Sequence, residues 1–442
     1  MSSTSGLLLI VDYNLTRIDD VIHMRKYARE RHGAGTALIR ANPTVLDAQI
    51  CDEVIDLDPL RSDFAEAGEK LLGARRGDFK AGIVFSDNAV QSGAALLERL
   101  GLHVDSSELA HGAFCKYQYR LSEARYRALL EAQRMLVPDF TKVSSMEDLH
   151  AFAAKHPSGF VIKPTKEGNN RGVVLVRAGG DRRAAFAEVS QYLANGVICE
   201  EIIPYQREFS FDGLGQSFFI TEKISATGRY PVEVAQVLPA RLDETERATL
   251  QRAGKQVNWL VGQCDGPFHN EIKLSDDGKR SAVVEPNRRP GGMKIWSLAR
   301  WVYGIDFYQR WIDSAFGAPP PLALPEPLCS AATVMLGVPS DRVFSPDDLA
   351  PEATPFEDAV AATADHLGLK RDDLSIKEFA WLSQKRRQFH GIPRDNADFV
   401  AQACIVLNTT RADIRDVVAT LREKWLVALD NSYARVEQAA SM

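Results

Sequence analysis

Hydrophobic and polar positions alternate along the first part of the chain in a way that predicts strands connected by helices. Continuous apolar runs have the length of buried strands, and the segments between them carry apolar residues at helical spacing. The expected elements are a strand at 7–11, a helix at 17–31, strands at 35–39 and 81–86, and a helix at 88–100. Gly101 directly follows the last helix and suits its C-terminal cap. Strands that alternate with helices favour a parallel sheet, so residues 1–112 are predicted to form an α/β domain.

Beyond residue 112 the regular alternation gives way to one helix followed by sheet-rich segments. The expected elements are a helix at 116–135, strands at 160–164 and 172–177, a sheet-rich region at 196–287 and a helix at 294–303. The proline-rich run at 319–327 predicts a stiff linker, because successive prolines continue neither a helix nor an inner strand. Strands at 331–337, 376–382 and 399–407 and a helix at 412–429 then predict a smaller α+β module. The chain is therefore expected to fold as four units, at 1–112, 113–195, 196–327 and 328–442.

The composition is that of an ordinary globular protein, with 45% hydrophobic and 25% charged residues among 442. No segment approaches the roughly 18 continuous apolar residues of a membrane span, and the apolar run at 7–11 is too short for a signal peptide. A cytoplasmic location and no membrane partner are therefore expected. Six scattered cysteines without a CxxC pair argue against a disulfide framework and a thiolate zinc site. The net charge of -6 gives no reason to expect nucleic acid, which favours small-molecule chemistry.

The N-terminal layout is Rossmann-like, but the turn after its first strand argues against a dinucleotide. That turn runs from Asp12 to Leu15 and has none of the glycines that allow the backbone to approach a pyrophosphate. Nicotinamide binding is therefore not expected, in spite of the layout.

The densest group of chemically active residues lies in a predicted β-hairpin. Two strands at 268–274 and 282–285 are joined by an Asp-Asp-Gly sequence that is typical of a tight turn. This arrangement places Glu271 beside Glu285, and Asn287 lies two residues further on the same face. Mg²⁺ prefers such oxygen donors and is usually held by one or two carboxylates together with nucleotide phosphates. Glu271, Glu285 and Asn287 are therefore predicted to bind Mg²⁺.

Two arginines follow the predicted metal ligands and are expected to point in opposite directions. Arg289 shares the ligand face, where a guanidinium suits phosphoryl or carboxylate oxygens, and Arg288 faces away. The run Glu-x-Asn-x-Arg, followed by Pro-Gly-Gly and preceded by a His-x-Glu strand, resembles the metal and phosphate site of ATP-grasp enzymes. The resemblance implies an ATP-grasp fold, mixed α/β and α+β, that uses ATP with Mg²⁺ or Mn²⁺. It implies a small lobe with a phosphate loop at 113–195 and a large lobe with the adenine hinge at 196–327.

Upstream segments resemble the phosphate-binding parts of the same family. Lys163 lies on a predicted strand, where it can contact phosphate oxygens, and a Glu-Gly-Asn-Asn-Arg-Gly loop similar to the family's flexible phosphate-covering loop follows. Gly168 and Gly172 free this loop so that its N–H groups can close over the triphosphate. The two asparagines and the arginine between them depart from the family loop, which is richer in glycine and serine. The implied contacts with the nucleotide phosphates come from Lys116, Lys163, Gly168, Asn169 and Gly172.

The segment after the phosphate loop resembles the family's adenine hinge. In that resemblance the N–H of Ile203 meets a ring nitrogen, and Glu200 or Glu201 meets the exocyclic amine. Glu208 accepts hydrogen bonds from the ribose hydroxyls. One extra residue separates hinge and ribose acid compared with the usual pattern, which leaves the choice between Glu200 and Glu201 open. Lys223 resembles a further phosphate-contacting lysine of some members.

The family resemblance implies a ligase that phosphorylates a carboxylate and joins the acyl phosphate to an amine, with release of ADP and phosphate. Catalytic roles are implied for Lys163, Glu285 and Arg289. The segment at 230–240 and the His-Asn-Glu run are most similar to bacterial L-amino acid ligases, which form dipeptides in antibiotic pathways. In that resemblance Glu233 neutralises the α-amino group of the activated amino acid, and His269 lines the acceptor side. The implied substrate contacts are Glu233, His269, Arg289, Gly291 and Gly292.

Two alternatives stay open. An ATP-grasp carboxylase or purine-pathway enzyme would activate bicarbonate or formate instead of an amino acid. A nucleotide-binding protein without turnover is the other alternative, although such a protein has no need of the complete Glu271, Glu285, Asn287 and Arg289 set. The C-terminal module carries no catalytic motif and is expected either to wall the substrate pocket or to form a homodimer contact.

Overall fold

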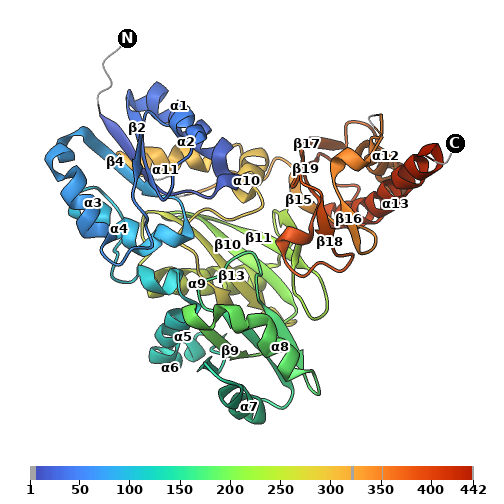
Figure 1. Ribbon diagram of the computed structural model, residues 1–442, viewed down its shortest axis with the longest axis horizontal. Coiled ribbons are helices and arrows are strands. Elements are labelled where there is room, and N and C mark those ends of the chain that lie inside the picture. The colour runs from blue at the N-terminus through green and yellow to red at the C-terminus, as the bar shows by residue number, and fades with distance from the viewer. Residues whose placement is uncertain (1–5, 320–322, 351, 441–442) are drawn as a thin grey trace.

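The structure is a computed structural model that describes residues 6–319, 323–350 and 352–440 (Figure 1). The chain forms an N-terminal domain, a small lobe and a broad central sheet that continues into the C-terminal part. Within these ranges no helix is long and apolar enough to cross a membrane. Short 3-10 helices lie in the connections, at Leu15–Arg17, Gly73–Asp78, Asp87–Ala89, Ala110–Ala113, Ser190–Asn195, Pro346–Asp348 and Asn396–Asp398.

The N-terminal domain confirms the predicted alternation of strands and helices. Its four parallel strands lie in the order β3-β2-β1-β4. They are β1 (Leu7–Val11), β2 (Gly35–Arg40), β3 (Glu53–Asp56) and β4 (Phe79–Val84), and the helices are α1 (Ile18–His32), α2 (Val45–Ile50), α3 (Phe64–Leu72) and α4 (Val90–Arg99). The strand order changes direction at β1, and open α/β sheets usually bind ligands beyond the carboxyl ends of the strands at such a point.

A separate antiparallel sheet of four strands forms the small lobe, in the order β6-β9-β7-β8. These strands are β6 (Phe140–Val143), β7 (Gly159–Pro164), β8 (Val174–Arg177) and β9 (Val197–Glu201), and the helices are α7 (Met146–Lys155) and α8 (Arg182–Val189). Because β9 pairs with β6 and β7, the small-lobe sheet extends past the predicted boundary at residue 195.

The single helix predicted at 116–135 is wrong in its extent. The structure has α5 (Lys116–Arg125) and α6 (Arg127–Ala132), followed by the short strand β5 (Met135–Leu136). Arg134 adopts a left-handed backbone with φ of 61°, which ends the helical run and turns the chain into β5. Helical periodicity alone did not reveal this turn, because arginine has no special preference for it.

The central sheet has nine strands and joins the large lobe to the C-terminal part, in the order β17-β19-β15-β12-β11-β10-β13-β14-β5. Its large-lobe strands are β10 (Arg207–Leu214), β11 (Ser217–Ser225), β12 (Glu233–Leu238), β13 (Pro267–Leu274) and β14 (Ser281–Glu285). The large-lobe helices are α9 (Glu244–Leu260), α10 (Ile295–Tyr303) and α11 (Phe307–Ala315).

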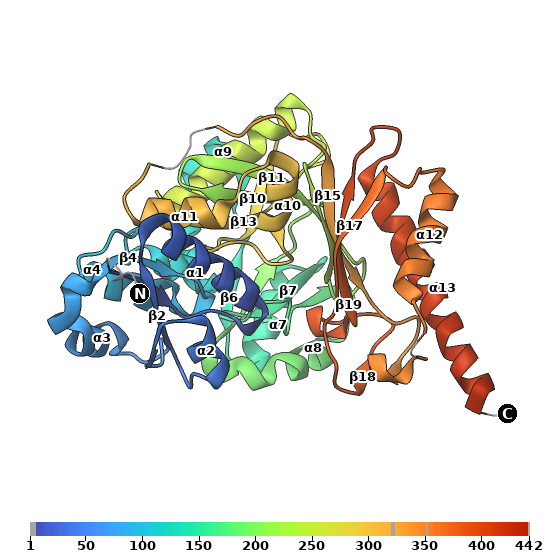
Figure 2. The same ribbon diagram turned by 90° about the horizontal axis from the view of Figure 1, so that it is seen from above.

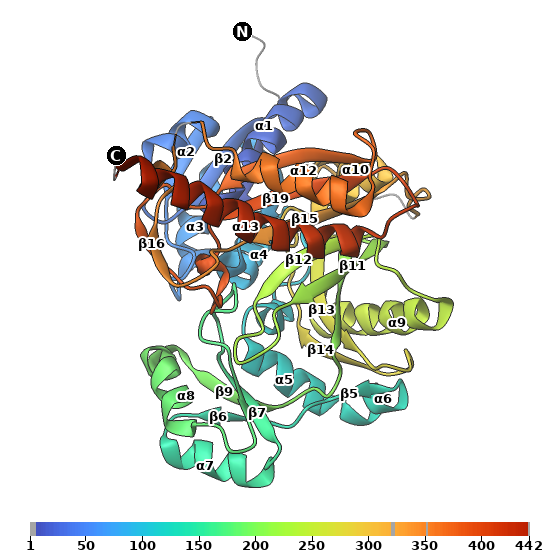
Figure 3. The ribbon, with the colours of Figure 1, turned by 90° about the vertical axis from the view of Figure 1, so that its right-hand side faces the viewer.

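Three C-terminal strands extend this sheet, and the other two form a small two-stranded sheet (Figures 2 and 3). β15 (Ser330–Leu336) pairs with β12, and β19 (Ala401–Leu407) and β17 (Leu374–Trp381) follow. The helices α12 (Pro355–Leu367) and α13 (Ile414–Ala440) lie along one side, and β16 (Arg342–Phe344) pairs with β18 (Arg387–Phe389). The predicted linker at 319–327 falls partly on residues 320–322, outside the described residues.

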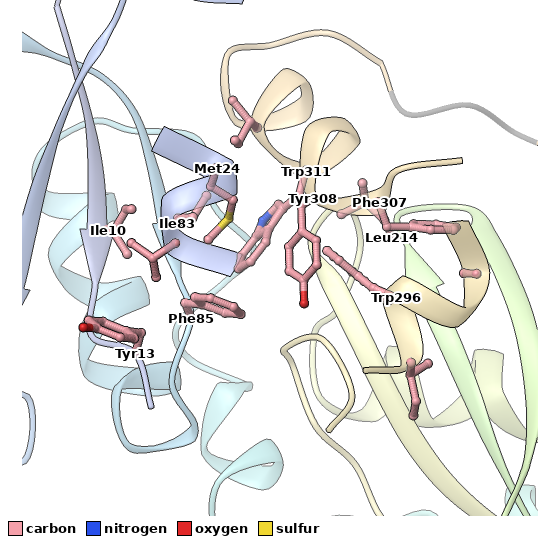
Figure 4. Packing of buried hydrophobic residues seen from close by; sticks show 14 of the residues in the cluster. Ile10, Tyr13, Met24, Ile83, Phe85, Leu214, Trp296, Phe307, Tyr308 and Trp311 are labelled. Atoms are coloured by element: carbon pink, nitrogen blue, oxygen red, sulfur yellow. The ribbon is translucent and has the colours of Figure 1, made fainter. Parts of the chain in front are cut away.

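A shared hydrophobic core holds the N-terminal domain against the large lobe (Figure 4). Ile83 and Phe85 of the N-terminal domain face Trp296, Tyr308 and Trp311 from α10 and α11. The rings of Phe85 and Trp311 meet edge to face at 5.6 Å. The end of β4 is thereby fixed next to the segment that follows β14.

Candidate active site

The predicted hairpin is confirmed and brings two of the three proposed metal ligands together. β13 and β14 are antiparallel neighbours, and Glu271 is the register partner of Glu285. The register shifts directly after this pair, between Glu271 and Ile272. Gly278 in the connecting turn has φ of +70°, a conformation that glycine adopts without strain.

Each of these two glutamates is paired with a lysine from a different part of the chain. Lys116 at the start of α5 approaches Glu285 to 2.7 Å and donates to the carbonyl of Glu167, at 2.7 Å, where the phosphate loop begins. Lys223 on β11 lies 2.8 Å from Glu271 and 3.0 Å from Glu208. Phosphate-loop, hinge-side and hairpin residues therefore meet at one place.

The residues present fit Mg²⁺ that shares its coordination with a nucleotide. No cluster of three or more His, Cys, Asp or Glu side chains that could hold a metal occurs in the described ranges. The hairpin instead offers two carboxylates and the amide oxygen of Asn287, whose amide nitrogen donates to the carbonyl of His269 at 3.1 Å. A site of one or two carboxylates completed by phosphate oxygens and water suits Mg²⁺.

Contacts with the N-terminal domain fix the position of the Arg289 side chain. Its Nε donates to Asp87, three residues after the end of β4, at 2.6 Å, and its Nη1 donates to the carbonyl of Pro290 at 3.0 Å. Arg17, also from the N-terminal domain, donates to the carbonyls of Pro290 and Gly291. As expected from the alternation, Arg288 points elsewhere.

Lys163 is part of a buried charge network that includes Glu200 of the predicted hinge. Its Nζ lies 2.7 Å from Glu200, and Arg120 of α5 contacts the other oxygen of Glu200 at 2.9 Å. Arg120 also pairs with Glu123 and donates to the carbonyl of Val283 on β14 at 2.9 Å. Burial raises the pKa of Glu200, but the charges of Arg120 and Lys163 outweigh it and lower the value to about 2.

The two candidate hinge acids therefore lie in different environments. Glu200 is held by Arg120 and Lys163, whereas Glu201 faces the other way and accepts from the N–H of Asp139 at 3.2 Å. In the described part of the chain the N–H of Ile203 donates to no acceptor, which leaves it available to a ring nitrogen.

The loop predicted to cover the phosphates, residues 167–172, has an unusual backbone. Asn169, Asn170 and Gly172 all have left-handed φ angles, of 58°, 59° and 68°. A Cβ at Gly172 would lie 2.8 Å from Tyr192 and 2.9 Å from Pro164, so this position requires glycine, while Gly168 has open space around it. Asparagine tolerates the left-handed region better than most residues, which explains how this loop departs from a glycine-rich pattern.

On the substrate side His269 is buried between two carboxylates. Its Nδ1 lies 2.7 Å from Asp212 and its Nε2 lies 3.3 Å from Glu271. Burial lowers the pKa of His269, but Asp212 and Glu271 raise it to about 9. Gly291 packs directly against this pair, because a Cβ there would lie 2.8 Å from the His269 ring, whereas Gly292 faces open space.

Glu233 opens β12 and has one buried oxygen without a hydrogen-bond partner in the described chain. Burial raises its pKa to about 7, although the charge of Lys223 acts in the opposite direction. A carboxylate that is partly protonated and incompletely satisfied is suited to a cationic ligand group.

Sequence reasoning missed four residues that organise this site, namely Arg17, Asp87, Arg120 and Asp212. Each acts through a partner far away in the chain, so no short motif contains it. Arg120 lies four residues after Lys116, on the same face of a helix, and this spacing was the only local signal.

This combination of a small antiparallel lobe, a large sheet with a paired-glutamate hairpin and a leading α/β domain is the ATP-grasp fold. The structure superposes on an L-amino acid ligase from Bacillus licheniformis with a TM-score of 0.69, 16% identity and coverage of 96% of this chain and 98% of that one. It also matches the ADP complex of an N5-carboxyaminoimidazole ribonucleotide synthetase, with a TM-score of 0.64, 16% identity and 98% of each chain covered.

The sequence is similar to curated carboxylate–amine ligases of this fold. Alanine–anticapsin ligase of Bacillus subtilis is 25% identical over 245 residues, which are 50% of this chain and 50% of that protein. The chain therefore spans about half the length of the curated relatives it matches. No family model matches the sequence.

Proposed function

We propose that the protein is an ATP-dependent ligase that joins a carboxylate, from an amino acid, to an amine or a second amino acid. The observation that supports this most directly is the register pair of Glu271 and Glu285, with Lys116, Lys223 and Arg289 around it. Paired carboxylates next to several cations suit a metal-bound triphosphate, because both groups must be held while one phosphoryl group moves.

The proposed reaction has two steps. A carboxylate oxygen of the first substrate attacks the γ-phosphorus of ATP, ADP leaves, and an acyl phosphate forms. The amine nitrogen of the second substrate then attacks the acyl carbon, phosphate leaves, and the nitrogen loses a proton. Mg²⁺, when bound, supplies positive charge to the transferring phosphoryl group.

The chain's own residues then have separate tasks. Lys116 and Lys163 hold phosphate oxygens, and Ile203, with Glu200 or Glu201, and Glu208 bind adenosine. Arg289, fixed by Asp87, stabilises negative charge on the transferring group and on the oxyanion that forms when the amine attacks. Burial of these charges strengthens each interaction, because less water screens it.

An amino acid as the activated substrate is supported by Glu233 and by the names of the similar proteins. Glu233 lies in the neighbourhood of His269 and Lys223 and presents a buried oxygen without a partner, which suits an α-ammonium group. Alanine–anticapsin ligase and L-amino acid ligase are both named for amino acid substrates.

The test measures phosphate release from Mg-ATP with amino acids supplied singly and in pairs. The wild type is compared with Glu285→Gln, which keeps the shape of the side chain but removes its charge. Glu423→Gln, on the exposed face of α13, is the matched control. Turnover only with particular pairs, lost in Glu285→Gln and kept in Glu423→Gln, is the expected result.

Two results would contradict parts of the proposal. Turnover driven by bicarbonate would favour a carboxylase, as the name of the similar N5-carboxyaminoimidazole ribonucleotide synthetase suggests. That result would refute the choice of an amino acid as substrate but would leave the ATP-dependent ligase proposal standing. Nucleotide binding without turnover under every condition would refute the ligase proposal as a whole.

A further inference from the structure

A cavity lies between the N-terminal domain and the large lobe, away from the proposed nucleotide site. It is lined on one side by β4, α4 and residues 103–105, and on the other by Gln263, residues 265–267, Arg288 and α11. The space open to the centres of water molecules is about 50 Å³. Because one water requires roughly 10–15 Å³ by this measure, the cavity has room for about four non-hydrogen atoms.

Arg288 brings an incompletely satisfied positive charge to this cavity. Only 6% of the residue is exposed, and Nη1 donates to the carbonyls of Ser106 and Val261, at 2.6 and 3.1 Å. Within the described ranges Arg288 forms no ion pair, and its Nε and Nη2 donate to no acceptor. Burial lowers the pKa of Arg288, and Asp105 offsets this only in part. The end of α9 at Val261 supplies partial negative charge, but only to Nη1.

Gln263 adds a second unused donor at the same place. It is 6% exposed, lines the cavity, and its Nε2 has no hydrogen-bond partner in the described chain. The Cα of Gly266 lies beside it, and a Cβ built on Gly266 would be 3.0 Å from both Gln263 Nε2 and Asp105 Oδ2. Asp105 itself is occupied, because its two oxygens accept from the N–H groups of Asp265 and Gly266 at 2.8 and 2.9 Å.

We propose that this cavity binds a small carboxylate, the size of acetate or glycine, through the free N–H groups of Arg288 and the amide of Gln263. A planar guanidinium matches a carboxylate with two parallel hydrogen bonds, and the amide supplies a third donor. Such a ligand would supply acceptors for the guanidinium N–H groups that donate to no protein acceptor. The apolar remainder of the wall, which includes Ile83 and Trp311, suits a methyl or methylene group.

A ligand in this cavity would stabilise the contact between Asp87 and Arg289. Arg288 and Arg289 are consecutive, and β4, which ends shortly before Asp87, lines the cavity. A carboxylate held here therefore fastens β4 to the segment that carries both arginines. The site is distinct from the one that binds the reacting carboxylate in the proposed function and does not depend on that proposal.

The experiment measures binding of acetate and, separately, of glycine to the full-length protein by saturation-transfer NMR, with chloride at equal ionic strength as the reference. Gly266→Ala fills the space beside Gln263 and keeps every charge, and its backbone lies outside the left-handed region. Arg288→Met removes the guanidinium. Arg241→Met, at a side chain that is 78% exposed, controls for the loss of one positive charge.

The expected result is saturable acetate binding in the wild type and in Arg241→Met, weakened about tenfold or more in Gly266→Ala and Arg288→Met, as expected for the loss of charge-assisted hydrogen bonds. Glycine that binds as well as acetate would support recognition of the carboxylate alone, and tighter binding would add a contact of its ammonium group with Asp105. Absence of saturable binding, or equal binding in Gly266→Ala and the wild type, would overturn the proposal. Should Arg288→Met fail to fold, Gly266→Ala decides alone.

Discussion

Replacement of Arg120 by methionine tests whether the buried charge network supports the nucleotide site. Arg120 has no exposed surface, and its partners Glu123 and Glu200 are 1% and 4% exposed. Methionine fills much of the same volume but leaves Glu123 without a cationic partner and Glu200 with Lys163 alone. Loss of one member of a buried ion pair costs about 3–5 kcal/mol, because the remaining charge stays desolvated.

The matched control is Arg99→Met, since Arg99 also contacts two glutamates but at the surface. Its side chain is 41% exposed and lies 2.6 Å from Glu66 and 2.8 Å from Glu69. Exposed pairs of this kind contribute about 0–1 kcal/mol, because water screens them. Urea unfolding followed by tryptophan fluorescence should therefore show a far lower midpoint for Arg120→Met than for Arg99→Met.

Two further measurements connect this network with function. Arg120→Met should weaken ATP binding, measured by displacement of a fluorescent nucleotide, because Glu200, the partner of Lys163, loses its other cationic partner. Adding Glu123→Leu to Arg120→Met should recover part of the lost stability, since it removes the unpaired charge. Equal midpoints for Arg120→Met and Arg99→Met would refute the reasoning, because burial would then have no energetic effect here.

Three other changes have defined outcomes. Gly291→Ala should lower kcat/KM at least about tenfold and lower the free energy of unfolding by about 1–3 kcal/mol, because its Cβ would clash with the buried histidine–aspartate pair. Gly292→Ala, at a position with open space, should leave the unfolding midpoint unchanged. Asp47→Asn should cost about 2–3 kcal/mol at neutral pH. Burial favours a higher pKa for Asp47, but hydrogen bonds from tyrosine and threonine hold its pKa below the usual 3.8. The difference in unfolding midpoint between wild type and Asp47→Asn should therefore stay constant above pH 3.8 and shrink as the pH falls below 3.8. Burial raises the pKa of Glu233 to about 7, so this carboxyl group becomes ionised as the pH rises from 6 to 8. The KM of the wild type for the amino acid should fall over that rise, and Glu233→Gln should abolish this trend.

Local patterns in the sequence predicted many of the strands and the geometry of the hairpin, but they missed several helices, among them α9 within the stretch predicted as sheet-rich. Period-two alternation placed Glu271 beside Glu285, and the structure has them as register partners. Alternation also separated Arg288 from Arg289, which have different partners: Arg288 donates to the carbonyl of Ser106, and Arg289 donates to the carboxylate of Asp87. Such predictions succeed because strand geometry and tight turns depend on neighbouring residues.

Relations between distant segments could not be predicted in the same way. The pattern at 331–337 correctly indicated a strand, but nothing local indicated that it would pair with β12 and extend the central sheet. Likewise Asp87 looks like an ordinary loop acid until the fold places it 2.6 Å from Arg289. The Arg120–Glu200 contact spans 80 residues, and a single sequence carries no record of such a pairing.

The continuous central sheet restricts how this molecule can change shape. Backbone hydrogen bonds run from β17 to β5, so the large lobe and the C-terminal strands can rotate only as one rigid body. The small lobe has its own sheet and is joined to that body by the short stretches 137–139 and 202–206. Under the proposed function, closure over a nucleotide would then be a swing of the small lobe, and Arg120 holds Glu200 beside one of the two connecting stretches.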